Sequence, residues 1–383
     1  MASATKHRVL FAQRRLPAYR MPFLELARSA LQQRGIELVF SHGDPSPAER
    51  LKRDEGHLAW AQRLPLTRYF FGKLCWQPFS TRGYDMVIVS QENSLLFNHW
   101  LCRPWRQFKL GFFGHGANLA AGNANSLRER FKRFTTRQAD WWFAYTSVSA
   151  ALLLRAGFAA SRTTVFNNAV DTQSLRRQVA DISPTQRQSM VEKLGLAPGK
   201  TGLFIGSLYE GKGLALLLAA AEHCASTDPQ FKLIVVGDGA AAGTVLHAAR
   251  QFSWLHWAGA QHGDAKALYL AVADFMLMPA SVGLAILDGF AVGLPIITTS
   301  AIGHGPEIAY LEPGLNGKLT EPNPCAFGAA IQQLLNDPAE LLVLRQGALS
   351  SGLKYTVQAM AQSFANGIDQ AIKASARGHD TAR

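Results

Sequence analysis

Short apolar runs alternate with longer amphipathic segments along most of the chain, and this pattern predicts an α/β protein. In the second half, turn residues separate the apolar runs from segments with helical periodicity. There we expect strands at 203–205, 232–236, 255–257, 275–278 and 295–298, and helices at 213–225, 244–252, 265–273 and 285–292. Such alternation favours a parallel sheet with helices on both faces.

The first half shows the same alternation less regularly. We expect strands at 9–12, 36–40, 86–90, 110–113, 141–145 and 164–166, and helices at 22–33, 126–139 and 149–156. The polar stretch 44–68 predicts turns, and 172–200 predicts a linker with the first helix of a second domain. Further helices are expected at 324–335, 338–346 and 357–374.

These segments predict a division into domains. We expect a first domain at 1–171, a second domain at 172–356, and a helix and tail at 357–383. The last helical segment is expected to cross back to the first domain. A chain of 383 residues is long enough for two such domains.

The positive charge is confined to the first part of the chain. The net charge is +12, and residues 1–150 hold 22 Lys and Arg against 10 Asp and Glu, whereas the remaining residues hold 17 of each kind. A basic domain favours an anionic membrane surface, an anionic polymer or nucleic acid as partner. No RRM, KH or helix-turn-helix pattern accompanies the charge, so we do not expect nucleic acid.

Targeting signals and membrane spans are not apparent in the sequence. Residues 1–16 have no long apolar stretch or cleavage site, and the apolar stretch 271–303 is interrupted by Asp274, Asp288 and two prolines. The cysteines lie too far apart for a zinc or disulfide framework. We expect a cytoplasmic protein, either free or held peripherally at the inner membrane through its basic half.

Candidate chemistry lies where predicted strands end, because ligands of parallel α/β sheets bind at the carboxyl ends of strands. The segment 206–213 joins a strand to a helix and contains Gly206, Ser207 and Lys212. The helix N-terminus and the lysine would suit a diphosphate. The alternative is a plain turn with a surface lysine.

A second strand end offers a similar arrangement. Gly283 and Leu284 precede a predicted helix, and Asp288 falls about one turn inside it. A carboxylate there would accept hydrogen bonds from ribose hydroxyls, or would only interact with the helix dipole. Gly237 and Asp238 follow another strand and resemble half of a dinucleotide fingerprint, but taken alone they favour a tight turn, since the third glycine is missing.

In the first half, His115 lies between two glycines directly after a predicted strand. This setting suits a side chain that reaches toward a ligand, and a surface-loop histidine is the alternative. No HExxH spacing is present, so we expect no metal site, and no GxSxG elbow supports serine hydrolase chemistry.

Several motifs in order resemble the family 4 glycosyltransferases of the two-Rossmann (GT-B) kind. Residues 165–171 are similar to the family's v-x-N-G-V-D, and 204–213 to v-G-R-L-x-x-x-K-G. The remaining matches are 233–239 (l-v-G-x-G), 258–259 (f-x-G), 283–293 (G-l-x-x-l-E-A-m-A-x-G), 304–308 and 316–317. Residues 14–23 are similar to the opening of bacterial polysaccharide and lipopolysaccharide members.

The resemblance implies a fold and a function. It implies an α/β chain with two Rossmann-like domains facing a cleft, a nucleoside-diphosphate sugar as donor, a glycan or lipid-linked acceptor, and retention of configuration without a metal or other cofactor. By the family's pattern the diphosphate would lie at Gly206, Ser207, Lys212, Gly283 and Leu284, and the nucleoside and ribose at Gly237, Asp238 and Asp288. His115 stands where the family keeps a histidine near the sugar.

Two departures from the family pattern bear on activity. The family's diphosphate arginine is replaced by Ser207, and the first glutamate of its E-x7-E pair is replaced by Ala280. The second glutamate is Asp288, one methylene shorter. These changes leave open an alternative, a non-catalytic relative that acts as a partner in a polysaccharide-assembly complex.

Overall fold

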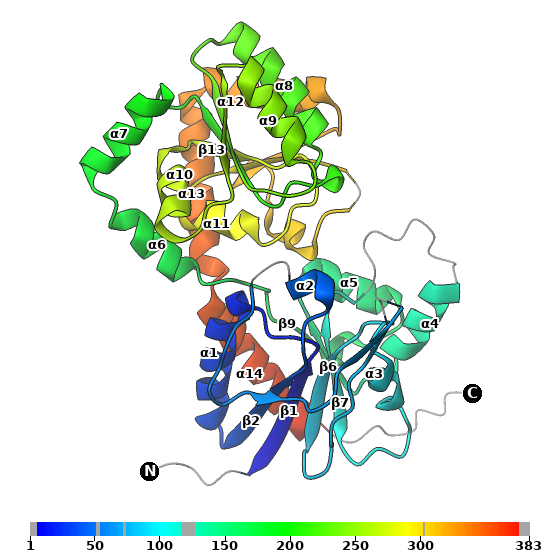
Figure 1. The fold of residues 1–383 in the computed structure, drawn as a ribbon. Coiled ribbons are helices and arrows are strands. Elements are labelled where there is room, and N and C mark those ends of the chain that lie inside the picture. The colour runs from blue at the N-terminus through cyan, green and yellow to red at the C-terminus, as the bar shows by residue number, and fades with distance from the viewer. Residues whose placement is uncertain (1–5, 51–53, 72–73, 117–126, 302, 375–383) are drawn as a thin grey trace. The chain divides into compact units, whose positions relative to one another are not determined.

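The computed structural model describes residues 6–50, 54–71, 74–116, 127–301 and 303–374. The chain divides into two compact units, one formed by Met1–Val170 with Val357–Arg383 and the other by Asp171–Thr356. Each unit is built around a parallel sheet (Figure 1). Among the described residues, no helix is long and apolar enough to cross a membrane.

The first unit has a sheet in the order β3-β2-β1-β6-β7-β8-β9, with every neighbouring pair parallel. Its strands are β1 (His7–Gln13), β2 (Ile36–His42), β3 (Gln62–Arg63), β6 (Met86–Ser90), β7 (Lys109–Gly114), β8 (Trp141–Ala144) and β9 (Thr163–Val165). A separate antiparallel pair is formed by β4 (Arg68–Phe70) and β5 (Leu74–Trp76).

Helices cover both faces of this first sheet. They are α1 (Met21–Gln32), α2 (Pro47–Arg50), α3 (Leu96–Trp100), α4 (Leu127–Thr136), α5 (Ser147–Arg155) and α14 (Val357–Lys373), with short 3₁₀ turns at Ala18–Arg20 and Ala160–Arg162. The polar stretch 44–68, expected to be rich in turns, also contains the short elements α2 and β3.

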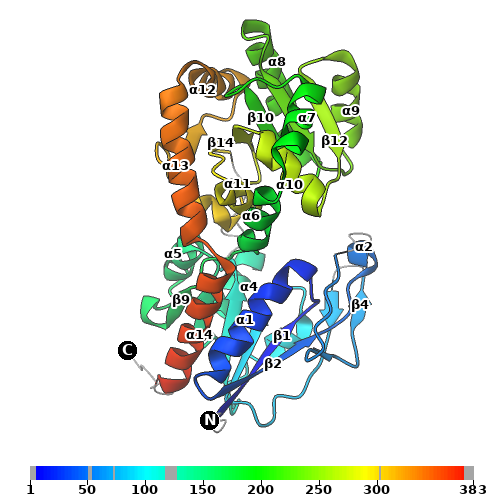
Figure 2. The same cartoon turned by 90° about the vertical axis from the view of Figure 1, so that its left-hand side faces the viewer.

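The C-terminal helix belongs to the first unit, as the sequence predicted. In α14, the ring of Phe364 packs against Phe11 of β1 and Phe143 of β8, with ring centroids 5.5 and 4.7 Å apart. Gly367 permits this approach, since a Cβ there would lie 2.4 Å from Thr164 Oγ1. Figure 2 shows α14 and α1 side by side on this sheet.

The second unit has a sheet in the order β12-β11-β10-β13-β14-β15, again all parallel. Its strands are β10 (Thr201–Ile205), β11 (Lys232–Val236), β12 (Leu255–Gly259), β13 (Phe275–Leu277), β14 (Ile296–Thr299) and β15 (Gly317–Thr320). Apolar side chains fill both faces of β10 and β11, which is the expected pattern for a sheet covered on both sides.

The helices of the second unit form two layers around this sheet. They are α6 (Thr172–Ala180), α7 (Pro184–Leu194), α8 (Leu214–Thr227), α9 (Ala242–Gln251), α10 (Gly263–Val272), α11 (Ala285–Ala291), α12 (Pro324–Asn336) and α13 (Pro338–Lys354), with 3₁₀ turns at Glu210–Lys212 and Pro306–Tyr310. Helices α8, α9 and α12 bury their apolar residues against Phe204, Val235 and Ile297. Helix α11 packs on the opposite face, where Gly289 approaches Met276 and Ile296.

Two sequence expectations for this unit were wrong. Residues 172–200, expected to be a linker with one helix, contain two helices, α6 and α7. Both begin at a polar cap: Asp171 accepts a hydrogen bond from Ser174 N at 3.0 Å, and Ser183 forms a capping box with Gln186. The sheet also has a sixth strand, β15, which escaped detection because its four residues contain one large apolar side chain, Leu319.

Candidate functional site

In the second unit the order of strands reverses between β10 and β13. From β10 the chain proceeds outward to β11 and β12, and it then returns to place β13 on the other side of β10 before continuing to β14 and β15. Such a reversal leaves a crevice at the carboxyl ends of the two central strands, where open α/β sheets bind ligands. The predicted binding segments 206–213 and 279–288 follow these two strands, β10 and β13 respectively.

The loop after β10 contains Gly206, Ser207 and Lys212. A Cβ at Gly206 would meet nothing closer than the Cε of Lys212 at 3.9 Å, so the backbone faces open space there. Lys212 Nζ donates a hydrogen bond to Ser281 O at 2.7 Å and thereby joins the two loops. Burial, despite a nearby Tyr209 that acts in the opposite direction, lowers the pKa of Lys212 below its ordinary value.

The loop after β13 is fixed on two sides. Ser281, with a positive φ of 48°, donates from Oγ to Gly211 O at 2.7 Å. Val282 N donates to His304 Nδ1 at 3.1 Å, and Thr299 Oγ1 donates to Pro279 O at 2.6 Å. The strained backbone is therefore held by hydrogen bonds from both neighbouring loops, as expected for a preorganised site.

Beyond this fixed segment, Gly283 opens toward solvent at the start of α11. A Cβ at Gly283 would meet no atom within 4 Å. His304 lies beside it as a neutral group, because its Nδ1 accepts from Val282 and its Nε2 donates to Thr299 O at 2.9 Å. Burial is the main cause that lowers the pKa of His304, and the charge of Lys212 adds to it. Lys212 therefore supplies positive charge here and His304 does not.

The predicted residues Gly237 and Asp238, which follow β11, pack against the loop after β10. Leu208 N donates to Asp238 O at 2.9 Å, and a Cβ at Gly237 would lie 1.9 Å from Gly206 O. The Asp238 side chain is exposed and accepts from Gly239 N at 2.7 Å. Glycine is thus required at position 237 by the close approach of two loops.

Asp288 lies in the first turn of α11, where the sequence placed it. Its Oδ2 accepts a hydrogen bond from Lys266 Nζ of α10 at 2.9 Å, and its side chain is 17% exposed. A carboxylate has acceptor capacity on both oxygens, so this ion pair leaves room for a hydroxyl. Lys266 is a partner that the sequence analysis did not identify.

The first unit has its own reversal of strand order, between β1 and β6. A pocket of about 250 Å³ lies at the carboxyl ends of these strands. Its floor is aromatic, formed by Phe11, Phe23, Phe40 and Phe113, and its walls include Arg14, Arg15, Arg20, Glu49, Glu92 and Tyr145. The pocket thus combines an apolar base with a charged rim, which is the usual composition of a small-molecule site.

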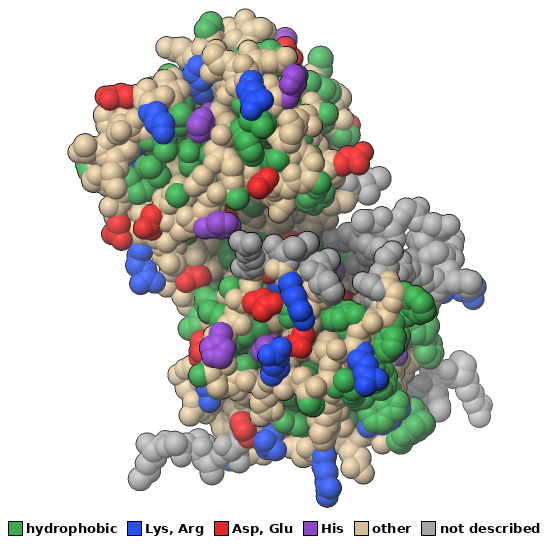
Figure 3. Space-filling model, viewed as in Figure 1, with side chains coloured by type: hydrophobic (Ala, Val, Ile, Leu, Met, Phe, Trp, Pro, Cys, Tyr) green, Lys and Arg blue, Asp and Glu red, His purple; other side chains and the backbone are tan. Residues whose placement is uncertain are grey.

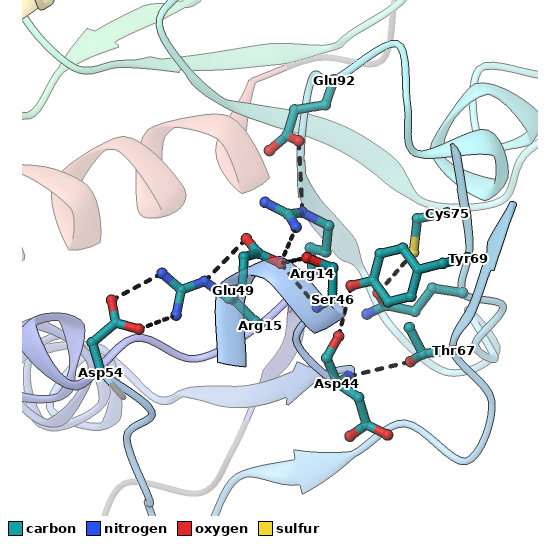
Figure 4. Close-up of polar contacts among 11 residues, drawn as sticks. Arg14, Arg15, Asp44, Ser46, Glu49, Asp54, Thr67, Tyr69, Cys75 and Glu92 are labelled. Carbon is teal, nitrogen blue, oxygen red and sulfur yellow. Dashed lines mark hydrogen bonds and ion pairs between the residues drawn. The ribbon is translucent and has the colours of Figure 1, made fainter. Parts of the chain in front are cut away.

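The charged rim is an interlocked network of arginines and carboxylates (Figure 4). Glu49 accepts from Arg14 Nη1 at 2.5 Å and from Ser46 N at 3.0 Å, and it lies 3.3 Å from Arg15 Nε. Arg15 also binds Asp54 through two hydrogen bonds of 2.7 and 3.0 Å. Figure 4 shows Arg14 between Glu49 and Glu92, but its distance to Glu92 Oε2 is 3.8 Å.

Glu49 and Glu92 therefore differ in character. Burial acts to raise the pKa of Glu49, but the hydrogen bonds from Ser46 and Arg14 outweigh it and hold that pKa below its ordinary value. Glu49 is thus a saturated structural carboxylate. The Glu92 side chain is 44% exposed, and among the described residues its one ion pair is the long one with Arg14, so it is the more available acceptor on the pocket rim.

His115 contacts a residue of this pocket. It follows Gly114, the last residue of β7, and its ring centroid lies 4.5 Å from that of Tyr145, a pocket residue. Arg20 donates to Tyr145 Oη at 3.2 Å and to Asn168 Oδ1 at 2.6 Å. Among the predicted site residues, His115 belongs to the first unit and all the others belong to the second.

Two family models match this chain. A family model described as Glycosyltransferase Family 4 matches residues 6–174, and a model described as Glycosyl transferases group 1 matches residues 199–337. The two models fall on the two structural units. The chain belongs to the family 4-like glycosyltransferases. No curated protein sequence matches it.

Solved glycosyltransferase structures share the fold over nearly the whole chain. HepE from Anabaena, solved in complex with UDP-glucose, aligns with a TM-score of 0.66 and 18% identity over 95% of this chain and 99% of that one. A glycosyltransferase from Rickettsia africae aligns with a TM-score of 0.68 and 14% identity over 97% of this chain and 100% of that one. Sucrose-phosphate synthase from Thermosynechococcus elongatus aligns with a TM-score of 0.67 and 16% identity over 95% of this chain and 99% of that one. This glycosyltransferase therefore has the GT-B fold.

The two departures of this glycosyltransferase from its family pattern lie in the two loops of the second unit. Ser207 follows Gly206, and Ala280 lies one residue before the strained Ser281. The residues that sequence reasoning missed are Ser281, Lys266, Glu49, Glu92 and Tyr145. Ser281, Glu92 and Tyr145 each follow a strand within a few residues, and this position is a signal for a binding role. Glu49, in contrast, lies on a short helix inside the polar stretch.

Proposed function

We propose that this glycosyltransferase transfers a sugar from a nucleoside-diphosphate sugar to a glycan or lipid-linked acceptor in cell-surface polysaccharide biosynthesis. One observation supports this most directly. At the strand reversal of the second unit, Lys212 and the open backbone at Gly206 and Gly283 come together in two loops joined by the Lys212–Ser281 hydrogen bond. This arrangement suits a diphosphate and needs few side chains.

In this proposal the second unit stabilises the leaving diphosphate. Negative charge builds up on the diphosphate as the glycosidic bond breaks, and Lys212 with nearby backbone amides would offset it without a metal. Because Lys212 is partly buried, its charge would act at lower effective dielectric than a surface lysine. Asp288 would hold the ribose with its second oxygen, and configuration at the sugar would be retained.

The first unit would hold the acceptor in its β1/β6 pocket. The aromatic floor and the rim carboxylate Glu92 suit the apolar face and the hydroxyl groups of a sugar. Tyr145, which lines the same pocket, and His115, which contacts Tyr145, would contribute further hydrogen bonds. We further propose a cytoplasmic enzyme that reaches a lipid-linked acceptor at the inner membrane through its basic first unit.

UDP is the nucleotide to test first, since HepE was solved with UDP-glucose. We expect UDP to bind in calorimetry and to raise the melting temperature. Lys212→Ala should weaken UDP binding at least tenfold, which corresponds to the loss of one charge-assisted contact of about 1.4 kcal/mol or more. Lys232→Ala is the matched control, because Lys232 Nζ also donates to a backbone carbonyl, Ser253 O at 3.1 Å, at the opposite end of β11. If no nucleoside diphosphate binds, the proposed donor site is wrong.

A second candidate function is a non-catalytic partner in a polysaccharide-assembly complex. The observations that favour it are Ser207 and Ala280, which remove an arginine and a carboxylate from the two loops of the donor site. The two functions predict different results with a panel of nucleotide sugars. The enzyme would release nucleoside diphosphate in the presence of acceptor, whereas the partner would bind nucleotide, if at all, without turnover. Lys212→Ala would then leave the cellular glycan unchanged.

A further inference from the structure

Helix α4 of the first unit presents its aromatic residues outward. Among its residues whose burial the structure describes, Thr135 and Thr136 are buried, and their hydroxyls accept hydrogen bonds from Gln91 Nε2 at 3.0 and 2.8 Å. Phe131 and Phe134, in contrast, are 46% and 62% exposed. A helix that covers a globular core places its apolar residues the other way round. Folding of this unit alone therefore does not explain the outward face of α4.

The same outward face is strongly cationic. Arg130 and Arg133 are exposed, and a period of 3.6 residues places them on the side of the helix that carries Phe131 and Phe134. Exposed aromatic and cationic side chains thus alternate on one helical surface.

The surface continues from α4 onto α3 and the loop after it. The rings of His99 and Phe131 lie 5.1 Å apart, and Arg106 Nη2 donates to Gln138 O at 2.9 Å, which ties the loop to the segment after α4. Trp100 and Trp105 are 50% and 75% exposed here. We define the aromatic–arginine face as Trp100, Trp105, Arg130, Phe131, Arg133 and Phe134. Figure 3 shows hydrophobic and Lys or Arg side chains side by side on the α3 side of this unit.

We propose that the aromatic–arginine face docks the protein on an anionic phospholipid bilayer. Exposed Trp and Phe side chains insert at the headgroup level, and arginines next to them bind lipid phosphates, so the two kinds of residue act on the same partner. A patch of several exposed aromatic residues is unusual on a soluble monomer and marks an interaction site. The proposal deepens the proposed function, because it names the surface that would bring a transferase to a lipid-linked acceptor.

Charge and shape distinguish a bilayer from other partners. A symmetric dimer through this face would bring the arginines of two copies together, and like charges in an interface are unfavourable. Proteins that bind single-stranded nucleic acid use a positively charged groove with aromatic rings whose faces are free to stack on the bases. Here the face of the Trp100 ring is already covered by Arg103, whose Cζ lies 3.5 Å from the ring centroid.

The test is sedimentation of the full-length protein with vesicles of phosphatidylcholine alone or mixed equally with phosphatidylglycerol. We expect binding to the mixed vesicles, a blue shift of tryptophan emission, and little binding to phosphatidylcholine. Arg130→Glu with Arg133→Glu should weaken binding more than tenfold, since each cation near an anionic surface contributes substantially. Phe131→Ser with Phe134→Ser should also abolish most binding.

Two matched controls lie in the second unit. Arg187→Glu with Lys193→Glu reverses two exposed cations of α7, and Leu342→Ala with Val343→Ala removes two exposed apolar side chains of α13. Both should bind vesicles like the wild type. UDP calorimetry on every variant separates this proposal from the donor site, because the patch variants should bind UDP unchanged. The proposal would be overturned if the wild-type protein stayed in the supernatant, or if variants of the aromatic–arginine face bound vesicles as well as the wild type. It would also be overturned if this face supported dimerisation or RNA binding without vesicle binding.

Discussion

The two strand reversals of this protein are alike in topology and opposite in chemistry. In the second unit, the β10 and β13 loops offer glycines, backbone groups and Lys212. In the first unit, the β1/β6 pocket is lined by long side chains whose charges largely compensate one another. Backbone sites suit a constant group such as a diphosphate, whereas side-chain sites can be varied for different acceptors. In the proposed function, the second unit would therefore bind the group common to all donors, and the first unit would select the acceptor.

The largest effect is expected from Gly237→Ala, which tests whether the second site depends on backbone approach. A Cβ would lie 1.9 Å from Gly206 O, and a backbone neighbour cannot move aside as a side chain does. We expect a loss of about 3 kcal/mol in the free energy of unfolding, together with loss of UDP binding. Chemical denaturation and calorimetry measure the two quantities.

Gly243→Ala is the control for this change. Gly243 lies in α9, and a Cβ there would meet nothing within 4 Å. Alanine should stabilise that helix by up to about 1 kcal/mol. If the two alanine variants were equally stable, the close approach of the loops would not be what requires Gly237.

Glu49→Gln tests whether the first pocket is held together by its ion network. Gln accepts fewer hydrogen bonds and leaves Arg14 and Arg15 with reduced compensation, so we expect a loss of about 2 kcal/mol at neutral pH. The pKa of Glu49 is lowered in the folded protein, so its contribution is present above the unfolded pKa and is lost as pH falls through the folded value. Glu49→Gln should therefore reduce the acid sensitivity of the first unit.

The matched control is Glu37→Gln. Glu37 binds Arg8 at 2.7 Å, but both side chains are almost half exposed, and surface pairs contribute at most about 1 kcal/mol. Equal stability losses for Glu37→Gln and Glu49→Gln would show that the pocket network is no stronger than an ordinary surface pair.

This contrast also explains what the sequence allowed us to predict. Most strands and helices, including α14, follow from periodicity, because apolar runs and capping residues are local signals. The loops of Gly206 and Gly283 were correctly placed after strands, because glycines directly after an apolar run are a local signal, and their role in binding stays a prediction. The pocket network was not predicted, because Arg14, Glu49 and Glu92 come from three distant segments. Strand β15 and one of the two helices in 172–200 were missed because their apolar content is low.

A smaller effect, on pH dependence, is expected from Lys212→Met. Burial is the main cause that lowers the pKa of Lys212 from its ordinary 10.5, so the folded state releases this proton before the unfolded state does. Stability should therefore rise with pH between the lowered value and 10.5, and UDP affinity should fall over the same range. Lys212→Met should remove this rise, whereas Lys232→Met should retain it. A wild-type slope in Lys212→Met would place the titration elsewhere.

The smallest effect on stability is expected from Glu92→Gln. This variant tests directly whether Glu92 and Glu49 have different roles in the first pocket. Glu92 lies 3.8 Å from Arg14 and is 44% exposed, so its removal should change the free energy of unfolding by less than about 0.5 kcal/mol. Glu49 and Glu92 line the same pocket. If Glu49 maintains the pocket and Glu92 binds the acceptor, Glu49→Gln should lower stability, whereas Glu92→Gln should impair transfer to the acceptor. Glu92→Gln should keep wild-type unfolding and UDP affinity but raise the KM for acceptor. A Glu92→Gln variant as unstable as Glu49→Gln would instead show that both carboxylates are structural, and that the acceptor is bound by other groups.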